Sequence, residues 1–281
     1  KMCDTCGCNI TPGNEHLVSA GGRLEKTADG REAITVLHGL LDENDHTAQH
    51  NRDHFNAHGV LAVNLMSSPG AGKTALLEAT IKELGDEFRM AVIEGDLETE
   101  NDAERIRKHG VTAIQITTGS ACHLDAHMVH DALHGLDLSS FDIVFIENVG
   151  NLVCPASFDL GQHNNVVLLS VPEGDDKPAK YPVMFRTADM VMLSKADLLP
   201  VLEDFSPARA EAYLRNLANP APMVHVSAKS GSGMADWAQW LRETIDQHRQ
   251  DLQSEPAARS GHHHSHDHDA EQHHGPDISQ A

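Results

Sequence analysis

The sequence predicts an α/β fold with a mostly parallel sheet and helices on both of its faces. From about residue 60 to residue 250, short apolar runs alternate with longer stretches of helical character. Continuous apolar runs indicate strands buried on both faces, which is the pattern of parallel sheets covered by helices. With 281 residues, the chain is long enough for one such domain plus terminal segments.

The elements are expected in a regular order along the chain. Residues 42–58 contain neither Pro nor Gly, and Asp42 is a candidate cap, so this segment is expected to be a helix. The expected strands are 60–66, 88–93, 111–116, 141–146, 166–171, 189–193 and 223–226. The expected helices between and after them are 73–84, 100–109, 122–135, 178–187, 207–217 and 234–249. This alternation of strands and helices favours the α/β class.

The chain divides into three expected parts. Residues 1–41 are interpreted as a flexible, Cys-rich metal-binding motif and linker, and residues 42–250 as the α/β domain with its N-terminal helix. Residues 251–281 are polar and rich in His. Such a segment cannot bury enough apolar area to fold, so a disordered tail is expected.

Composition argues against several classes of partner. Lys and Arg total 21 against 42 for Asp and Glu, a formal net charge of -21. This charge would repel a phosphate backbone, so no nucleic-acid partner is expected. No run approaches the ~18 apolar residues of a membrane span, and the N-terminus lacks an apolar signal-peptide core. We therefore expect a cytoplasmic protein with reduced thiols and no membrane partner.

A phosphate-binding loop is predicted at residues 67–74, SSPGAGKT, between a strand and a helix. Strand, Gly-rich loop and helix in this order are what a P-loop requires, and they predict a P-loop NTPase. The expected phosphate-binding residues are Gly70, Ala71, Gly72, Lys73 and Thr74. Lys73 would neutralise the β- and γ-phosphates, and the Thr74 hydroxyl would bind Mg²⁺. Ser67 replaces the usual first Gly.

Two acidic residues follow strands, at the edge of the sheet where open α/β sheets bind ligands. Asp96 comes after the second expected strand and Glu147 after the fourth. Either carboxylate would hold Mg²⁺, directly or through water, or orient the attacking water. Lys73, Asp96 and Glu147 are therefore the candidate catalytic residues, with an exposed loop carboxylate as the alternative for each acid.

Guanine is the expected base. Ser194-Lys195-Ala196-Asp197 stands where GTPases usually have Asn-Lys-x-Asp. Asp197 would accept hydrogen bonds from two guanine N–H groups that adenine does not offer, and the Lys195 stem would pack on the ring. Ser227, Ala228 and Lys229 resemble the last guanine-contacting loop of GTPases. These residues predict GTP and GDP rather than ATP.

Cysteines supply two candidate metal sites. Cys3, Cys6 and Cys8 form a C-x-x-C-x-C motif whose thiols can chelate one soft or borderline metal ion. Cys122 and His123 stand together, and Cys154 follows Glu147 closely in sequence. If the loop after Glu147 moves on hydrolysis, Cys154 moves with it, which would link nucleotide state to metal affinity.

Histidines recur at helical spacing. One stripe, His123, His127, His130 and His134, falls on one face of an expected helix, and His46, His50, His54 and His58 recur every four residues on another. A solvated polar face is the alternative, and His127 is the preferred additional ligand. The tail offers His262, His263, His264, His266 and His268. Imidazoles suit Ni²⁺ and Zn²⁺, so metal storage or buffering is favoured there over an inert tail or a purification feature.

Several motifs together resemble the hydrogenase nickel-incorporation GTPase family. They are the N-terminal cysteine motif, residues 67–74, Glu94-Gly95-Asp96, Cys122-His123-Leu124-Asp125 and the stretch 147–156, ENVGNLVCPA. The resemblance runs from about residue 60 to residue 245 and includes the N-terminal motif. Of these motifs, the stretch 147–156 is the most specific.

The resemblance implies a GTP-hydrolysing nickel metallochaperone with low turnover and nucleotide-linked dimerisation. It implies nickel or zinc at Cys122, His123 and Cys154, and tighter nickel binding at the N-terminal cysteines. Lys180, together with Lys177, resembles the family's basic loop near the dimer interface and nucleotide. The implied partners are a companion nickel chaperone and the precursor of the [NiFe]-hydrogenase large subunit.

Three alternatives stay open at this point. The first is a urease accessory GTPase, which shares the P-loop, the dimer and nickel. The second is a nickel or zinc storage protein whose nucleotide site is secondary. The third, an ATP-dependent enzyme with incidental histidines, is disfavoured by Asp197.

Overall fold

The structure is a computed structural model that describes residues 33–96, 101–119 and 121–254. Within these ranges seven strands form one sheet in the order β3-β2-β4-β1-β5-β6-β7, and every pairing is parallel. The strands are β1 Leu61–Ser67, β2 Met90–Asp96, β3 Thr112–Thr117, β4 Ile143–Glu147, β5 Asn164–Ser170, β6 Met190–Ser194 and β7 Met223–His225. The predicted parallel sheet is confirmed.

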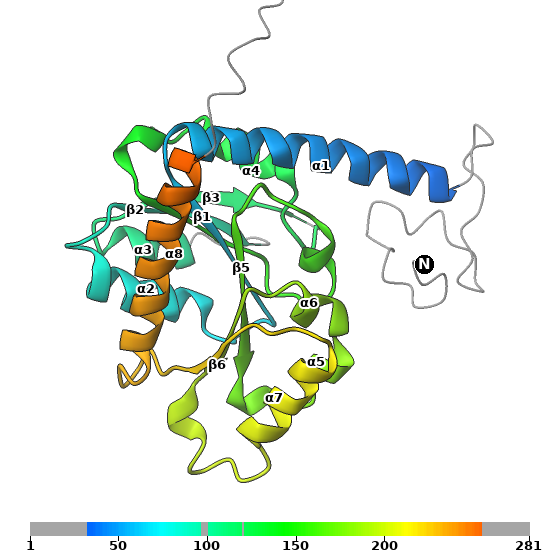
Figure 1. Cartoon of the computed structure of the whole chain (residues 1–281), viewed down its shortest axis with the longest axis vertical. Helices are drawn as coiled ribbons and strands as arrows, with labels where there is room; N and C mark the ends of the chain where they lie inside the picture. The colour runs from blue at the N-terminus through cyan, green and yellow to red at the C-terminus, as the bar shows by residue number, and fades with distance from the viewer. Residues whose placement is uncertain (1–32, 97–100, 120, 255–281) are drawn as a thin grey trace, which may run out of the picture.

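Helices connect the strands and cover both faces of the sheet (Figure 1). They are α1 Ala33–Ala57, α2 Lys73–Leu84, α3 Asn101–Arg107, α4 Ala126–Leu133, α5 Lys177–Lys180, α6 Pro182–Arg186, α7 Pro207–Asn216 and α8 Met234–Ser254. Short 3₁₀ turns are η2 Leu138–Ser140, η3 Cys154–Ser157, η4 Val171–Glu173 and η5 Ala196–Leu198.

The core lies in two layers because successive strand side chains point to opposite faces. Leu61, Val63 and Leu65 of β1 pack in the layer that contains α2, α3 and α8. On the opposite face, Ala62 packs in a cluster with Phe55 of α1 and Val129 of α4. A third cluster joins β5 and β6 to α6 and α7. β1 is buried along its whole length, so the loop that follows it is rigidly anchored.

Several helix boundaries differ from the sequence-based expectation. α4 begins at Ala126 rather than at 122, because Asp125 is extended and its side chain accepts a hydrogen bond from the Met128 N–H at 2.9 Å. The expected helix 178–187 is divided at Tyr181, since Pro182 disfavours helical backbone in the residue before it. α1 begins at Ala33, ahead of the expected 42, and α8 continues to Ser254.

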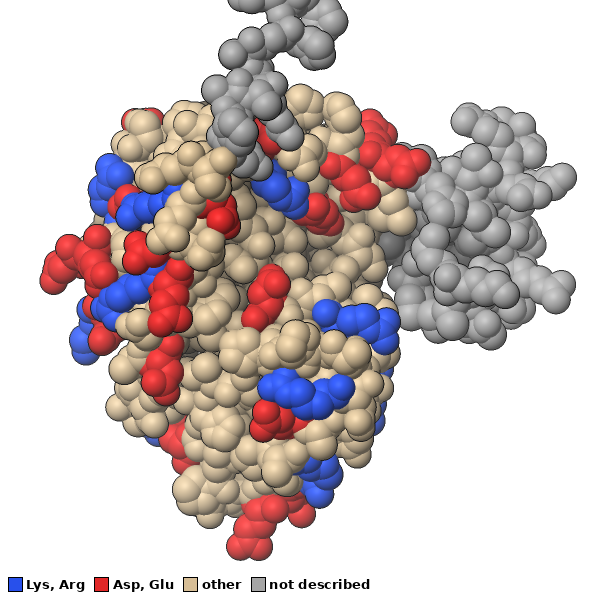
Figure 2. All heavy atoms as spheres, viewed as in Figure 1, with Lys and Arg blue, Asp and Glu red and all other residues tan. Residues whose placement is uncertain are grey.

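Charged side chains of both signs are interspersed over the face seen in Figure 2, where grey atoms do not cover it. None of the helices in the described ranges is both long and apolar enough to span a membrane.

Candidate functional site: a nucleotide loop beside a thiol–imidazole cluster

The loop after β1 has the backbone of a phosphate-binding loop. Gly70 and Gly72 have positive φ, 74° and 102°, which glycine adopts without strain. Lys73 begins α2 and is 8% exposed, and its Nζ donates to Ser67 Oγ at 3.1 Å. Ser67, which replaces the usual glycine, therefore positions the lysine. The N-terminus of α2 is aimed at the loop, as anion binding requires.

Thr74 and Glu147 meet because β1 and β4 are neighbours in the sheet. Thr74 Oγ1 donates to Glu147 Oε1 at 2.9 Å, and Glu147 Oε2 has no hydrogen-bond partner among the described residues. Burial raises the pKa of Glu147 to about 7, although Lys73 and the Thr74 hydroxyl oppose this shift. The hydroxyl and the acid that were separately predicted to hold Mg²⁺ therefore lie in contact.

Two further acids, Glu94 and Asp102, lie with Glu147. One carboxylate oxygen of each lies within 4.8 Å of the others. Burial, then repulsion from Glu147 and Asp102, raises the pKa of Glu94 to about 8, and Glu94 Oε2 is buried without a partner. Mg²⁺ prefers oxygen ligands, and buried carboxylates with unpartnered oxygens beside a threonine hydroxyl fit it. Asp96, at the end of β2, is half-buried and outside this group.

Sequence reasoning did not identify Glu94 and Asp102. The available signal for Glu94 was an acid within the apolar run of β2, a place where an unpaired charge is costly. Asp102 had no such signal, since an acid in the first turn of a helix is common.

The predicted base-recognition loop after β6 is hydrogen-bonded to the P-loop. Ser194 Oγ donates to the Ala71 carbonyl and Lys195 Nζ to the Gly70 carbonyl, each at 2.7 Å. Ser194 therefore takes a bracing role where GTPases usually have Asn. Ser227 Oγ donates to Asp197 Oδ1 at 2.7 Å, which joins the loops after β6 and β7.

Asp197 is exposed, as a base-contacting carboxylate must be before it binds. The remaining predicted residues lie nearby in sequence: Ala228 is half-buried and Lys229 is exposed. Lys180 pairs with Asp176 on α5 at 2.6 Å.

The predicted ligands Cys122, His123 and Cys154 converge. The Cys122 thiol donates to Cys154 Sγ at 3.0 Å and lies 3.8 Å from His123 Nδ1. One ligand atom of each lies within 4.8 Å of the others. Two thiols and an imidazole form a donor set that suits Ni²⁺ or Zn²⁺.

The metal-free electrostatics of this cluster favour neutral groups. Both cysteines are free and half-buried, and burial followed by the Cys122 thiol raises the pKa of Cys154 to about 11. Burial lowers the pKa of His123, whose ring stacks on Phe158 at 3.9 Å between centroids. Neutral His123 has a lone pair available for a metal ion, and metal binding would displace the thiol protons.

The predicted histidine stripe is not one helical face. His123 precedes α4, because that helix starts after Asp125. Only His127 and His130 lie in the helix, with His134 as its C-cap. A ring nitrogen of His127 lies 3.4 Å from Thr47 Oγ1 of α1, and His127 is not in the group with Cys122 and Cys154. Cys3, Cys6 and Cys8, and the tail histidines His262, His263, His264, His266 and His268, lie outside the described residues.

Residues 147–154 join the two sites. Asn148 Oδ1 accepts from the Leu124 N–H at 3.2 Å, and Asn151 Nδ2 donates to the Cys122 carbonyl at 3.3 Å. A Cβ on Gly150 would lie 2.8 Å from Pro69 Cα of the P-loop, so only glycine fits there. One short segment thus contacts the P-loop at one end and the thiol pair at the other.

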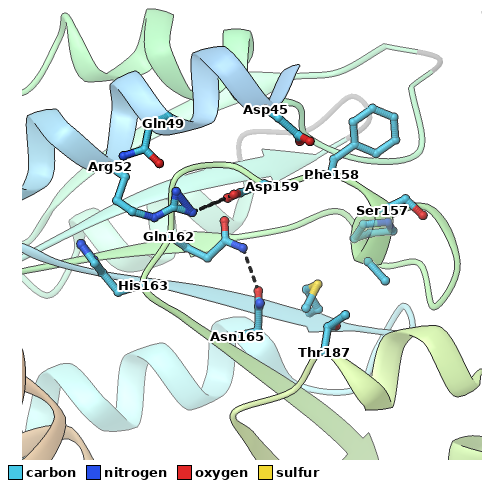
Figure 3. A pocket seen from close by; sticks show the side chains of 13 residues that line it. Asp45, Gln49, Arg52, Ser157, Phe158, Asp159, Gln162, His163, Asn165 and Thr187 are labelled. Carbon is cyan, nitrogen blue, oxygen red and sulfur yellow. Dashed lines mark hydrogen bonds and ion pairs between the residues drawn. The ribbon is translucent and has the colours of Figure 1, made fainter. Parts of the chain in front are cut away.

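A polar cavity of about 630 Å³ lies between α1 and the segment after Cys154 (Figure 3). Arg52 of α1 pairs with Asp159 at 2.7 Å, and Gln162 Nε2 donates to Asn165 Oδ1 at 3.1 Å. The Arg52–Asp159 pair holds the segment beyond Cys154 against α1.

A P-loop at the carboxyl end of a parallel sheet, with carboxylates and a thiol–imidazole cluster beside it, defines a P-loop nucleotide-binding protein equipped for metal. Residues 61–225 match the family described as CobW/HypB/UreG, nucleotide-binding domain. The chain belongs to this family, and within it to the HypB hydrogenase maturation factors.

Curated relatives support this assignment. The chain is 53% identical over 208 residues to "Hydrogenase maturation factor HypB" of Azotobacter vinelandii, covering 74% of this chain and 68% of the relative. It is 50% identical over 211 residues to the Escherichia coli K12 protein of the same name, covering 75% and 72%. It is 45% identical over 237 residues to "Hydrogenase/urease maturation factor HypB" of Helicobacter hepaticus, covering 83% and 95%.

Solved structures agree in fold. The crystal structure of HypB from Helicobacter pylori in complex with nickel is 44% identical, has a TM-score of 0.70, and covers 73% of this chain and 96% of that one. HypB from Archaeoglobus fulgidus is 39% identical with a TM-score of 0.68, covering 73% and 100%. The predicted P-loop NTPase fold is confirmed.

Proposed function

We propose that this protein is a GTP-hydrolysing nickel metallochaperone that helps to insert nickel into the precursor of the [NiFe]-hydrogenase large subunit in the cytoplasm. The observation that carries the proposal is segment 147–154, which begins at the Thr74–Glu147 hydrogen bond and ends at the Cys122–Cys154 thiol pair. The names of the relatives, and the nickel complex of one of them, support the same role.

In the proposed nucleotide site, the P-loop backbone and Lys73 bind the phosphates, and Asp197 selects guanine. Glu147 and Asp96 are the acids proposed to hold the cation or to orient the attacking water, and Glu94 and Asp102 add negative charge beside them. Mg²⁺, when bound, would neutralise charge on the β- and γ-phosphates. Thr74 would then exchange its hydrogen bond to Glu147 for the cation.

In the proposed cargo site, Cys122, His123 and Cys154 bind Ni²⁺ or Zn²⁺. The N-terminal thiols Cys3, Cys6 and Cys8 are proposed to bind nickel more tightly, and the tail histidines to buffer it. His127, on the side of α4 that faces α1, would reach the cargo only after a rearrangement.

Coupling follows from the shared segment. When Thr74 releases Glu147, the positions of Asn148 and Asn151 change, and with them the approach of Cys154 to Cys122. Metal then binds the two nucleotide states with different affinity, which is what a population shift requires. We further propose that GTP favours a homodimer, that Lys180 acts near its interface, and that a companion nickel chaperone takes part in the transfer.

The decisive measurement is the affinity for Ni²⁺ and Zn²⁺ with GDP and with a non-hydrolysable GTP analogue. It compares the intact chain with a Cys122→Ala/Cys154→Ala variant. We expect a nucleotide-dependent shift in the intact chain alone. An affinity that ignores nucleotide in both proteins would instead indicate a metal store with a separate GTPase.

Two Helicobacter relatives are named for both hydrogenase and urease maturation. Urease is therefore the alternative recipient. Deleting the gene and measuring nickel in purified hydrogenase and urease separates the two, since only the true recipient loses its nickel.

A further inference from the structure

Helices α1 and α4 lie side by side (Figure 1), and the order of their contacts shows that they run in the same direction. Asn44 accepts from the Ala126 N–H at 2.9 Å, and Thr47 lies 3.4 Å from His127. One turn further along α1, Asn51 Oδ1 lies 2.9 Å from the His130 ring. One turn further still lie His54 of α1, His58 just after the end of α1, and His134, the C-cap of α4.

Four histidines thus gather where the two helices end. The rings of His54 and His58 lie 5.0 Å apart between centroids, and those of His130 and His134 lie 4.9 Å apart. The pKa of His54 is lowered by burial and then by the charges of His58, His130 and His134, so His54 lies within electrostatic reach of the other three rings. Among the described residues no three of these histidines have ring nitrogens within 4.8 Å of one another, so the rings must rotate to share an ion.

Hydrogen bonds fix the tautomers of two of these rings. Asn51 Nδ2 donates to the carbonyls of Ala126 and Leu160 at 2.9 and 3.1 Å, so Asn51 Oδ1 must face His130. His130 Nδ1 therefore donates to Asn51 Oδ1, and its Nε2 keeps the lone pair. His58 does the same by donating from Nδ1 to the His54 carbonyl at 2.9 Å.

This arrangement is typical of metal-binding histidines, which donate one ring N–H to an oxygen and bind the ion through the other nitrogen. We propose that His54, His58, His130 and His134 form a further metal site that binds a divalent transition cation such as Ni²⁺ or Zn²⁺ and joins α1 to α4.

The four rings are half-buried or exposed, so they can rotate onto an ion without disturbing the core. The site contains nitrogen donors alone, which distinguishes it from the thiol site at Cys122 and Cys154. Hydrogen bonds from the Ser139 and Ser140 hydroxyls chiefly lower the pKa of Asp137, and His58 adds to this shift, so an ionised carboxylate lies near the four rings and offsets part of the charge of a bound cation.

The test uses the full chain and reads each histidine separately. The protein is titrated with Zn²⁺, and separately with Ni²⁺. Its histidines are modified with diethyl pyrocarbonate, and the modified peptides are quantified by mass spectrometry. At a metal concentration ten times the apparent Kd of the site, we expect labelling of His54, His58, His130 and His134 to slow together by about tenfold. Binding at the thiols or in the tail does not affect this readout.

The variant His134→Ala separates a site between helices from independent binding on each helix. In this variant we expect metal to protect His54, His58 and His130 much less. The matched control is His50→Ala, which removes an exposed ring on α1 that pairs with His46 at 4.7 Å, and which should leave the protection of the four intact.

Two results would overturn the proposal. One is equal labelling of the four rings with and without metal. The other is unchanged protection of His54 and His58 in His134→Ala, which would indicate a pair on α1 alone. His134 and His58 are both exposed, so His58→Gln serves as a second variant if the circular dichroism of His134→Ala differs from that of the wild type.

Discussion

At the scale of single residues, Lys73 lies close to the carboxylates of Glu94 and Glu147. It is nearly buried, and its charge opposes the rise that burial causes in the pKa of Glu94 and Glu147. Replacing it by Ala removes the cation that would meet the phosphates. We predict that Lys73→Ala lowers GTP turnover on the order of 10²–10³-fold, the usual effect of losing one charge-stabilising group.

Phosphate release measured at saturating GTP checks this prediction for Lys73. The matched control is Lys82→Ala, which removes an exposed lysine from the last turn of the same helix and should retain wild-type turnover. Wild-type turnover in Lys73→Ala would exclude the P-loop as the hydrolytic site.

Gly150 lies in segment 147–154, where this segment packs against Pro69 of the P-loop. Because an added Cβ would meet the backbone of Pro69 at 2.8 Å, Gly150→Ala must move one of the two loops. We predict weaker nucleotide binding, on the order of tenfold, since about 1.4 kcal/mol of misfit corresponds to that factor. Equilibrium binding of a fluorescent GDP analogue gives the measurement.

The control for this change is Gly135→Ala, whose Cβ would meet the flexible end of Ile114 at 3.0 Å, in a different part of the sheet. Equal loss of nucleotide affinity in both variants would mean that the effect is a general loss of packing.

The sequence could predict site residues only where a local motif indicates their chemical role. Lys73, Thr74 and Glu147 could be proposed because a P-loop and the carboxyl end of a strand are visible in sequence. Glu94 was missed because its perturbed pKa depends on burial and on Glu147, which is distant in sequence. The same limit applies to His127, since its neighbour Thr47 belongs to another helix.

At the scale of elements, His163 joins α1, β1 and α8. Its Nδ1 accepts from the Ala62 N–H and its Nε2 donates to Asn56 Oδ1, both at 2.9 Å, and its ring lies 4.2 Å from that of His248. Burial, then the charges of His248 and Arg52, lowers the pKa of His163 from 6.5 to about 3. The folded protein therefore holds this ring neutral.

Because the pKa of His163 is lower in the folded than in the unfolded protein, only the unfolded chain takes up a proton between these two values. The free energy of unfolding is therefore highest above pH 6.5 and decreases as the pH falls toward 3. We predict that the wild type loses about 1–2 kcal/mol more free energy of unfolding between pH 7.5 and pH 5 than His163→Gln does. Urea unfolding at both pH values measures this.

The exposed His50→Gln variant should keep the wild-type pH slope of the free energy of unfolding. Parallel slopes in wild type and His163→Gln would show that the ring is protonated in the folded state.

The strands were predictable because a strand buried on both of its faces has a continuous run of apolar residues. All seven strands are present within a few residues of the expected positions. Helix starts were less predictable. Residues 122–125 look helical by composition, but Asp125 caps α4 and leaves Cys122 and His123 in a loop, where they can face Cys154. The expected helix 178–187 is divided at Tyr181 because of Pro182. The sequence did not predict this division, since the residues on either side of Pro182 favour a helix.

At the scale of the whole molecule, the proposed coupling between the two sites must be mutual by thermodynamic linkage. β1 and β4 are fixed side by side, so segment 147–154 is the described part that can transmit a change from Thr74 to Cys154. If nucleotide changes metal affinity by some factor, metal bound at that same site must change nucleotide affinity by an equal factor.

We therefore predict that Zn²⁺ shifts the Kd of a non-hydrolysable GTP analogue by the same factor, on the order of tenfold, by which the analogue shifts the Kd of Zn²⁺. Calorimetric titrations in both orders measure the two factors. In Cys122→Ala/Cys154→Ala both factors should fall to one. Coupling that persists undiminished in Cys122→Ala/Cys154→Ala would mean that the coupled metal is not the one at Cys122 and Cys154.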